Sequence, residues 1–187
     1  MEALLVSTAA VAIAEIGDKT QLLALLLAAR FRRFWPVAWG ILVATLLNHG
    51  AAAWLGALAA GWLSPTAQRW AVAGSFLAVA AWALVPDRLD ADEVPKPPRF
   101  GAFVTTTVAF FLVEIGDKTQ IATVVLAAQY DALAMVVAGT TLGMLAANLP
   151  VVALGGRFAE RLPVAWFRYG AALLFGVLGV AVLLGAG

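Results

Sequence analysis

The chain has 187 residues, of which 63% are hydrophobic and only 12% are charged, with 12 basic and 11 acidic side chains. Soluble domains are about half apolar and about a quarter charged, so this composition excludes a soluble globular domain and a disordered tail. It also excludes a nucleic-acid-binding module, which needs a basic face. The chain has no cysteine and only one histidine, His49, so it lacks the ligands of a zinc–thiolate site or an iron–sulfur cluster. We therefore predict an integral membrane protein without a tightly bound cofactor.

Apolar stretches long enough to cross a bilayer recur along the chain. A helix needs about 20 apolar residues to cross a hydrocarbon core of roughly 30 Å. Apolar runs bounded by Arg, Pro or Asp predict six membrane spans, over Ala3–Ala29, Pro36–Leu58, Arg69–Val85, Gly101–Ala128, Leu133–Leu154 and Trp166–Leu184. The first run lacks the basic segment of a secretory signal, so we interpret it as a span of the mature protein.

A polar stretch divides the chain into two nearly equal halves. Residues 86–100, PDRLDADEVPKPPRF, combine four acids, three bases and four prolines. Such a segment does not form a packed helix, so we expect an exposed linker. The predicted organisation is a three-helix half over residues 1–85, a linker over 86–100 and a second three-helix half over 101–187.

The basic residues predict the orientation of the chain. In a six-span arrangement, three loops on the same side hold nine of the twelve bases, and the opposite side keeps only Arg69. The nine are Arg30, Arg32, Arg33, Arg88, Lys96, Arg99, Arg157, Arg161 and Arg168. Basic loops stay in the cytoplasm, which predicts a cytoplasmic linker and both termini outside.

The two halves share a repeat at a spacing of 99 residues. Residues 14–21 are AEIGDKTQ, and residues 113–120 are VEIGDKTQ. Because each half holds three spans, an odd number, the second half must cross the membrane in the opposite sense. The predicted fold is therefore an all-α membrane protein of six transmembrane helices in two inverted three-helix repeats, an architecture that many secondary transporters use.

The repeat places acids near the middle of the first and fourth spans. Four carboxylates and two lysines, if all charged in lipid, would cost on the order of 15 kcal/mol, so they must face a wet or protein-lined interior. At 100° per residue the acids of each motif share one helix face, and the pseudo-twofold relation should bring both faces together. We predict a cation- and proton-binding site of Glu15, Asp18, Gln21, Glu114, Asp117 and Gln120, with the four acids as metal ligands.

Other polar residues are assigned supporting roles. Gly17 and Gly116 lower the cost of a helix break, and Lys19 and Lys118 tune the charge of the site. For Thr20 and Thr119, a role in the site and hydrogen bonding to their own helix are equally good interpretations.

Polar residues in the second and fifth spans are harder to assign. Asn48 and Asn148 are 100 residues apart, so pairing them shifts the repeat by one position. They supply either carbonyl ligands or interhelical hydrogen bonds. His49 has no partner under this pairing, and we expect it to pack between helices.

A site of hard oxygen donors with an excess of negative charge suits Ca²⁺ or Mn²⁺ as a transported substrate. When the cation leaves, burial and mutual repulsion favour protonation of the crowded carboxylates, although the lysines oppose it. This competition predicts an antiporter that exports divalent cations in exchange for protons. The alternatives are a divalent-cation channel, an exporter of small organic solutes, an intramembrane metal-dependent enzyme, and ion pairs that only hold helices together.

At Glu15-Ile16-Gly17-Asp18-Lys19-Thr20, and again 99 residues later, the sequence resembles the cation/proton antiporter family of Golgi calcium–manganese transporters and small bacterial manganese exporters. The family's hallmark is a doubled Glu-x-Gly-Asp-(Lys/Arg)-(Thr/Ser) motif. The resemblance covers nearly the whole chain and implies six or seven helices, binding of Ca²⁺ or Mn²⁺ by the motif acids, and exchange for protons. The chain lacks the extra N-terminal segment of eukaryotic members, which favours a bacterial plasma (inner) membrane.

Overall fold

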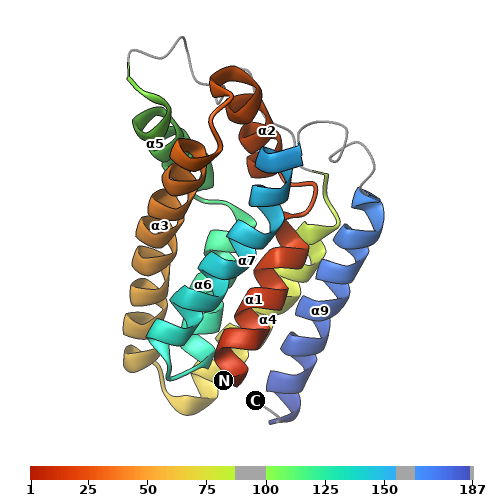
Figure 1. The fold of residues 1–187 in the computed structure, drawn as a ribbon. Helices are drawn as coiled ribbons and strands as arrows, with labels where there is room; N and C mark the ends of the chain where they lie inside the picture. Colours follow the sequence, from red (N-terminus) through yellow and green to blue (C-terminus); the bar gives the residue numbers. More distant parts are fainter. Residues whose placement is uncertain (87–99, 155–162, 186–187) are drawn as a thin grey trace.

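The computed structural model describes residues 1–86, 100–154 and 163–185, and these residues form an all-helical bundle (Figure 1). Most of the predicted linker lies outside the described residues, as do Arg157 and Arg161.

The first predicted span is two helices and not one. α1 covers Glu2–Glu15 and α2 covers Lys19–Phe31. Between them Gly17 has a φ of +85°, a conformation that glycine adopts without the steric strain of other residues. Asp18 then caps α2, because its carboxylate accepts a hydrogen bond from the backbone N–H of Thr20 at 3.3 Å.

The fourth predicted span is broken in the same way, into α5 (Ala102–Glu114) and α6 (Lys118–Gln129). Gly116 has a φ of +78°, and Asp117 caps α6 through the N–H of Thr119 at 3.3 Å. The two glycines, which the sequence analysis expects to lower the cost of a helix break, both lie in such a break. The expectation that each Glu and Asp share one helix face is wrong, because each Glu ends one helix and each Asp precedes the next.

The remaining helices are continuous. α3 covers Phe34–Trp62, α4 covers Pro65–Ala83, α7 covers Leu133–Leu154 and α9 covers Val164–Leu184. α3, α7 and α9 are each long and apolar enough to cross a membrane. The described residues are thus those of a helical membrane protein.

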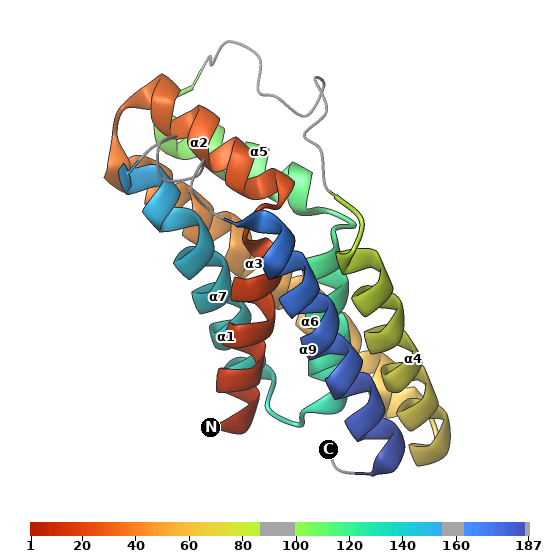
Figure 2. The ribbon, with the colours of Figure 1, turned by 90° about the vertical axis from the view of Figure 1, so that its right-hand side faces the viewer.

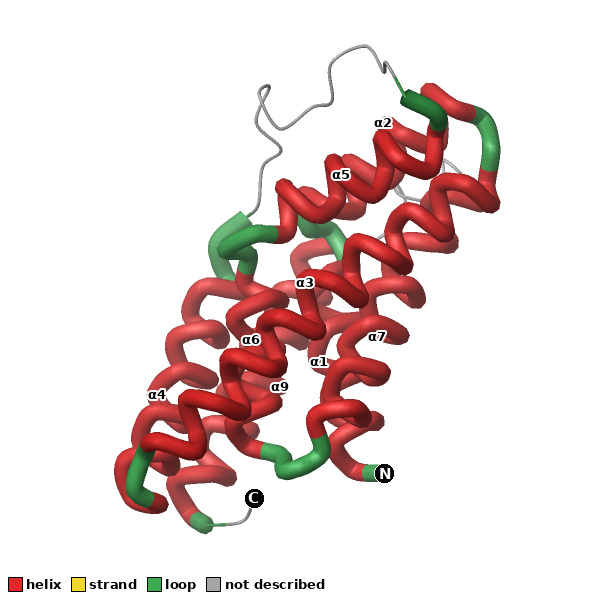
Figure 3. The backbone as a smooth tube through the Cα atoms, turned by 90° about the vertical axis from the view of Figure 1, so that its left-hand side faces the viewer, coloured by secondary structure: helices red, strands yellow, loops and turns green. Residues whose placement is uncertain are grey.

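Corresponding helices of the two halves run in opposite directions (Figures 1 and 2). α1 and α2 lead away from the end that holds both termini, whereas α5 and α6 lead back toward it. α3 is likewise opposed to α7, and α4 to α9. α2 and α5 lie side by side at the end opposite the termini (Figure 3).

The packing repeats at the same 99-residue spacing. α1 packs on α7 where a Cβ on Gly139 would lie 2.9 Å from Cβ of Ser7, and α5 packs on α3 where a Cβ on Gly40 would lie 2.7 Å from Cβ of Thr106. Small residues permit this close approach of helix backbones. α4 packs on α9, where the rings of Phe76 and Phe175 stack at 6.2 Å.

Candidate cation-binding site

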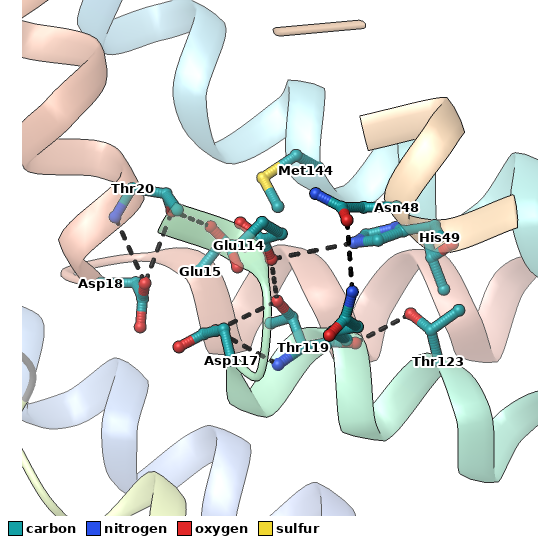
Figure 4. Close-up of polar contacts among 12 residues, drawn as sticks. Glu15, Asp18, Thr20, Asn48, His49, Glu114, Asp117, Thr119, Thr123 and Met144 are labelled. Carbon is teal, nitrogen blue, oxygen red and sulfur yellow. Dashed lines mark hydrogen bonds and ion pairs between the residues drawn. The ribbon is translucent and has the colours of Figure 1, made fainter. Parts of the chain in front are cut away.

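Three acids from the two helix breaks converge inside the bundle (Figure 4). Glu15 ends α1, Glu114 ends α5 and Asp117 precedes α6, and their side chains are at most 3% exposed. One carboxylate oxygen from each lies within 4.8 Å of the other two. We call Glu15, Glu114 and Asp117 the three-acid cluster. Both halves of the chain contribute residues to it.

A threonine after each break orients the glutamate that precedes it. The hydroxyl of Thr20 donates to Oε2 of Glu15 at 2.5 Å, and the hydroxyl of Thr119 donates to Oε1 of Glu114 at 2.6 Å. Both threonines are fully buried. Each hydroxyl is thus bonded to a glutamate of its own motif, and a role of these threonines in cation binding stays a prediction.

Asp18, the fourth predicted ligand, is not in the three-acid cluster. Its Oδ1 lies 2.8 Å from Nζ of Lys118, and both side chains are almost completely buried. This ion pair joins the break of the first half to the break of the second. The equivalent lysine, Lys19, is only partly buried, so identical motifs have different surroundings.

Gln21 and Gln120 form hydrogen bonds to the backbone of the two helix breaks. Oε1 of Gln21 accepts from the N–H of Gly17 at 3.0 Å, and Oε1 of Gln120 accepts from the N–H of Gly116 at 2.7 Å. These bonds use the oxygens that the sequence analysis assigns to the cation. The glutamines therefore satisfy backbone groups that the helix breaks expose.

The amide nitrogens of the same glutamines reveal how α3 and α7 correspond. Nε2 of Gln120 donates to Oδ1 of Asn48 on α3 at 3.2 Å. Nε2 of Gln21 donates to the backbone oxygen of Ala147 on α7 at 3.0 Å. The counterpart of Asn48 is therefore Ala147, and the 99-residue spacing continues without a shift.

Under this register the counterpart of His49 is Asn148. Nδ2 of Asn148 lies 3.5 Å from Oε2 of Glu15, and Nε2 of His49 lies 3.9 Å from Oε1 of Glu114. The pairing of Asn48 with Asn148 in the sequence analysis is wrong, because it matched residue type and not position. The placement of His49 as a packing residue is also incomplete, since its ring is directed at an acid of the cluster (Figure 4).

Several buried polar atoms at the site make no hydrogen bond within the part of the chain that the structure describes. They are Oε1 of Glu15, Oε2 of Glu114, Oδ1 of Asn148 and both ring nitrogens of His49. Leaving one buried polar group without a partner costs about 1–3 kcal/mol. Unpartnered oxygens beside clustered carboxylates fit a bound cation, because a cation uses them as ligands.

The match to a family model covers nearly all of the chain. The model, described as "Divalent cation/proton antiporter GDT1", matches residues 3–91 and 102–187. The chain belongs to this family. It is a family of transporters and not of enzymes, which removes the intramembrane enzyme from the alternatives.

A curated protein from Vibrio cholerae serotype O1 (strain ATCC 39541 / Classical Ogawa 395 / O395), named "Putative manganese exporter", is 51% identical over 182 residues, covering 97% of this chain and 90% of the relative. No solved structure matches the chain. The family and the relative support cation transport by this protein.

His49 and Met144 are the site residues that sequence reasoning missed. Sδ of Met144 accepts from Nδ2 of Asn148 at 3.0 Å, so this buried side chain helps hold the amide beside Glu15. The strict 99-residue register, applied without a shift, would have placed His49 opposite Asn148. Nothing in the sequence singles out Met144, because an apolar residue in an apolar helix carries no signal.

Proposed function

We propose that this protein exports Mn²⁺ from the cytoplasm in exchange for protons, and that the three-acid cluster binds the cation. The observation that carries the proposal is the convergence of three buried carboxylates from two inverted motifs. The family description supports exchange for protons, and the relative's name supports manganese and export.

The charge of the cluster explains why cation and protons would compete. Three carboxylates within 4.8 Å repel one another strongly away from water, so they need positive charge between them. A divalent cation supplies it in one state, and protons on the carboxylates supply it in the other. Asp18 is already neutralised by Lys118, and we propose that this pair holds the two halves together in the present arrangement.

We further propose six membrane spans, in which α1–α2 and α5–α6 each cross as one broken helix. α1 and α2 have 14 and 13 residues, too few to span a bilayer separately. The opposed directions of corresponding helices support two inverted repeats, over residues 1–85 and 101–187, with rocking of one half against the other as the transport step.

We propose a bacterial inner-membrane protein, and its basic residues support an orientation with both termini outside. Arg30, Arg32 and Arg33 lie at the α2–α3 connection, at the end of the bundle opposite both termini (Figure 1). Arg69 lies in the first turns of α4, at the end that holds the termini. By the positive-inside rule, the end with the three arginines faces the cytoplasm.

Exchange is tested in proteoliposomes that contain a pH-sensitive dye. A Mn²⁺ gradient should move protons in the opposite direction, and Glu114→Gln should abolish this movement. Glu2→Gln is the matched control, because Glu2 is an exposed acid in the first turn of α1. Cation flux without proton movement would contradict the proposal and favour a channel.

Orientation is tested by cysteine labelling, which is clean because the chain has no cysteine of its own. Ser64→Cys, between α3 and α4, should react with a membrane-impermeant maleimide added to intact spheroplasts. Arg33→Cys, between α2 and α3, should react only after lysis. The reverse pattern would contradict the proposed orientation.

A further inference from the structure

The side chain of His49 occupies an unusual position on α3. It is fully buried, and neither ring nitrogen makes a hydrogen bond to any described residue. Its Nε2 lies 3.9 Å from Oε1 of Glu114, too far for a hydrogen bond (Figure 4). A buried polar ring without hydrogen-bond partners is costly, so its direction toward the cluster needs a reason.

The two halves of the repeat hold different residues at this position, His49 in one and Asn148 in the other. Asn148, the counterpart of His49, approaches Glu15 with an amide that also donates to the backbone oxygen of Met144 at 3.1 Å. His49 approaches Glu114 with an imidazole that has no such second bond among the described residues. The imidazole is therefore available to a ligand on the side of the site that holds Glu114 and Asp117.

The separation of His49 from Glu114 fits two ligands of one cation. His49 is not one of the residues whose ligand atoms all lie within 4.8 Å of one another, so Glu114 is the acid that joins it to the cluster. Bonds from divalent cations to their ligands are about 2.1–2.4 Å, so ligand atoms on opposite sides of a cation lie about 4.2–4.8 Å apart and adjacent ones about 3.0–3.4 Å apart. The carboxylate oxygens of the cluster are within 4.8 Å of one another, and the separation of His49 Nε2 from Glu114 Oε1 is 3.9 Å. Both values lie within the span of a single coordination sphere.

A nitrogen ligand discriminates between the two candidate substrates of the sequence analysis. Ca²⁺ and Mg²⁺ are hard cations that take oxygen ligands. Mn²⁺ also prefers oxygen, but as a divalent first-row transition metal it accepts an imidazole nitrogen more readily than Ca²⁺ does. We propose that His49 supplies a nitrogen ligand beside the three-acid cluster, and that this ligand makes the site favour Mn²⁺ over Ca²⁺. This inference rests on the proposed function and names the substrate class of the same site.

A direct test is electron spin-echo spectroscopy of Mn²⁺ bound to the detergent-purified protein, prepared without a histidine tag. His49 is the only histidine, so labelling all histidine with ¹⁵N changes only this ring. We expect a ¹⁴N coupling to Mn²⁺ that is replaced by a ¹⁵N coupling in the labelled protein. This measurement uses the wild-type chain and does not depend on a variant that folds.

A variant test uses His49→Asn, because the other half already holds an asparagine at the equivalent position. Loss of the ligand should lower Mn²⁺ affinity at least about tenfold, the loss that removal of even an outer-sphere partner causes. Ca²⁺ affinity, measured by the same titration, should be unchanged. Leu47→Ala, an exposed side chain on the same helix, is the control for nonspecific effects on α3.

The outcomes separate this inference from the proposed function. Bound Mn²⁺ without a histidine coupling, or an equal loss of Mn²⁺ and Ca²⁺ affinity in His49→Asn, would overturn the role of His49 and leave the three-acid cluster as the site. Failure of the wild-type protein to bind Mn²⁺ at all would overturn both.

Discussion

Replacing Lys118 by methionine should destabilise the protein strongly. Its Nζ lies 2.8 Å from Oδ1 of Asp18, and both groups are buried. At this distance the attraction is about 6 kcal/mol for an effective dielectric constant of about 20, and desolvation of the two charges offsets much of it. Removing one partner leaves a buried charge uncompensated, so we expect Lys118→Met to lose about 3–5 kcal/mol of unfolding free energy.

The double variant Asp18→Asn/Lys118→Met should recover most of that loss. Asparagine still caps α2, because its side-chain oxygen accepts from the N–H of Thr20 as the aspartate does. Replacing both charges of a buried pair is often neutral. The assay is equilibrium unfolding of the purified protein in micelles by titration with SDS, with Lys19→Met as a partly exposed control that should lose at most about 1 kcal/mol.

Additive losses would refute this reasoning. If the double variant lost as much unfolding free energy as Asp18→Asn and Lys118→Met lose when measured singly and added, the Asp18–Lys118 pair would have no coupling energy. The double variant should also keep Mn²⁺ binding, because neither residue belongs to the three-acid cluster. Loss of binding in a stable double variant would return Asp18 to the ligand set.

Further substitutions test the cluster and the helix breaks. Asp117→Asn should lower Mn²⁺ affinity in a calorimetric titration by at least about tenfold while α6 stays capped, and unchanged affinity would remove Asp117 from the cluster. Gly17→Ala and Gly116→Ala should each lower the unfolding free energy by about 1–2 kcal/mol, because both glycines have a positive φ. Gly17→Ala should lower the thermal midpoint further than Gly116→Ala, because a Cβ on Gly17 would lie 2.1 Å from Cγ1 of Val164. Adding Val164→Ala should partly restore Gly17→Ala and leave Gly116→Ala unchanged; equal midpoints would contradict the contact.

The doubled motif was sufficient to predict much of the site. Buried charge in an apolar chain has few places to go, so Glu15, Glu114 and Asp117 could be expected to meet in the interior. Glycine in the middle of each span indicated where a break would cost least, although each span was treated as one helix. The meeting of the three acids depends on the cost of charge in lipid, which can be read without coordinates, whereas cation binding by these acids stays a prediction.

Inferences that depended on tertiary contacts failed. Treating span one as a continuous helix placed Asp18 on the face of Glu15, whereas the break at Gly17 turns Asp18 into a helix cap. Matching Asn48 with Asn148 followed residue type, whereas the bonds of the two glutamines and the close contacts of Gly40 and Gly139 keep α3 and α7 in the strict 99-residue register.

The two motifs have unequal surroundings, and this difference bears on how an inverted repeat could open its site to one side of the membrane at a time. The residues from Glu15 to Gln21 are identical to those from Glu114 to Gln120, so local sequence cannot cause the difference between the two breaks. The difference comes from the helices packed around them: Val164 of α9 covers Gly17, whereas no atom of the described residues beyond the neighbours of Gly116 lies within 4 Å of a Cβ built on it. Two inverted repeats with identical motifs but unequal cover expose one break and close the other. If the halves exchanged their surroundings, the exposed break would move to the opposite side, and a fixed site between them would be reached from each side in turn.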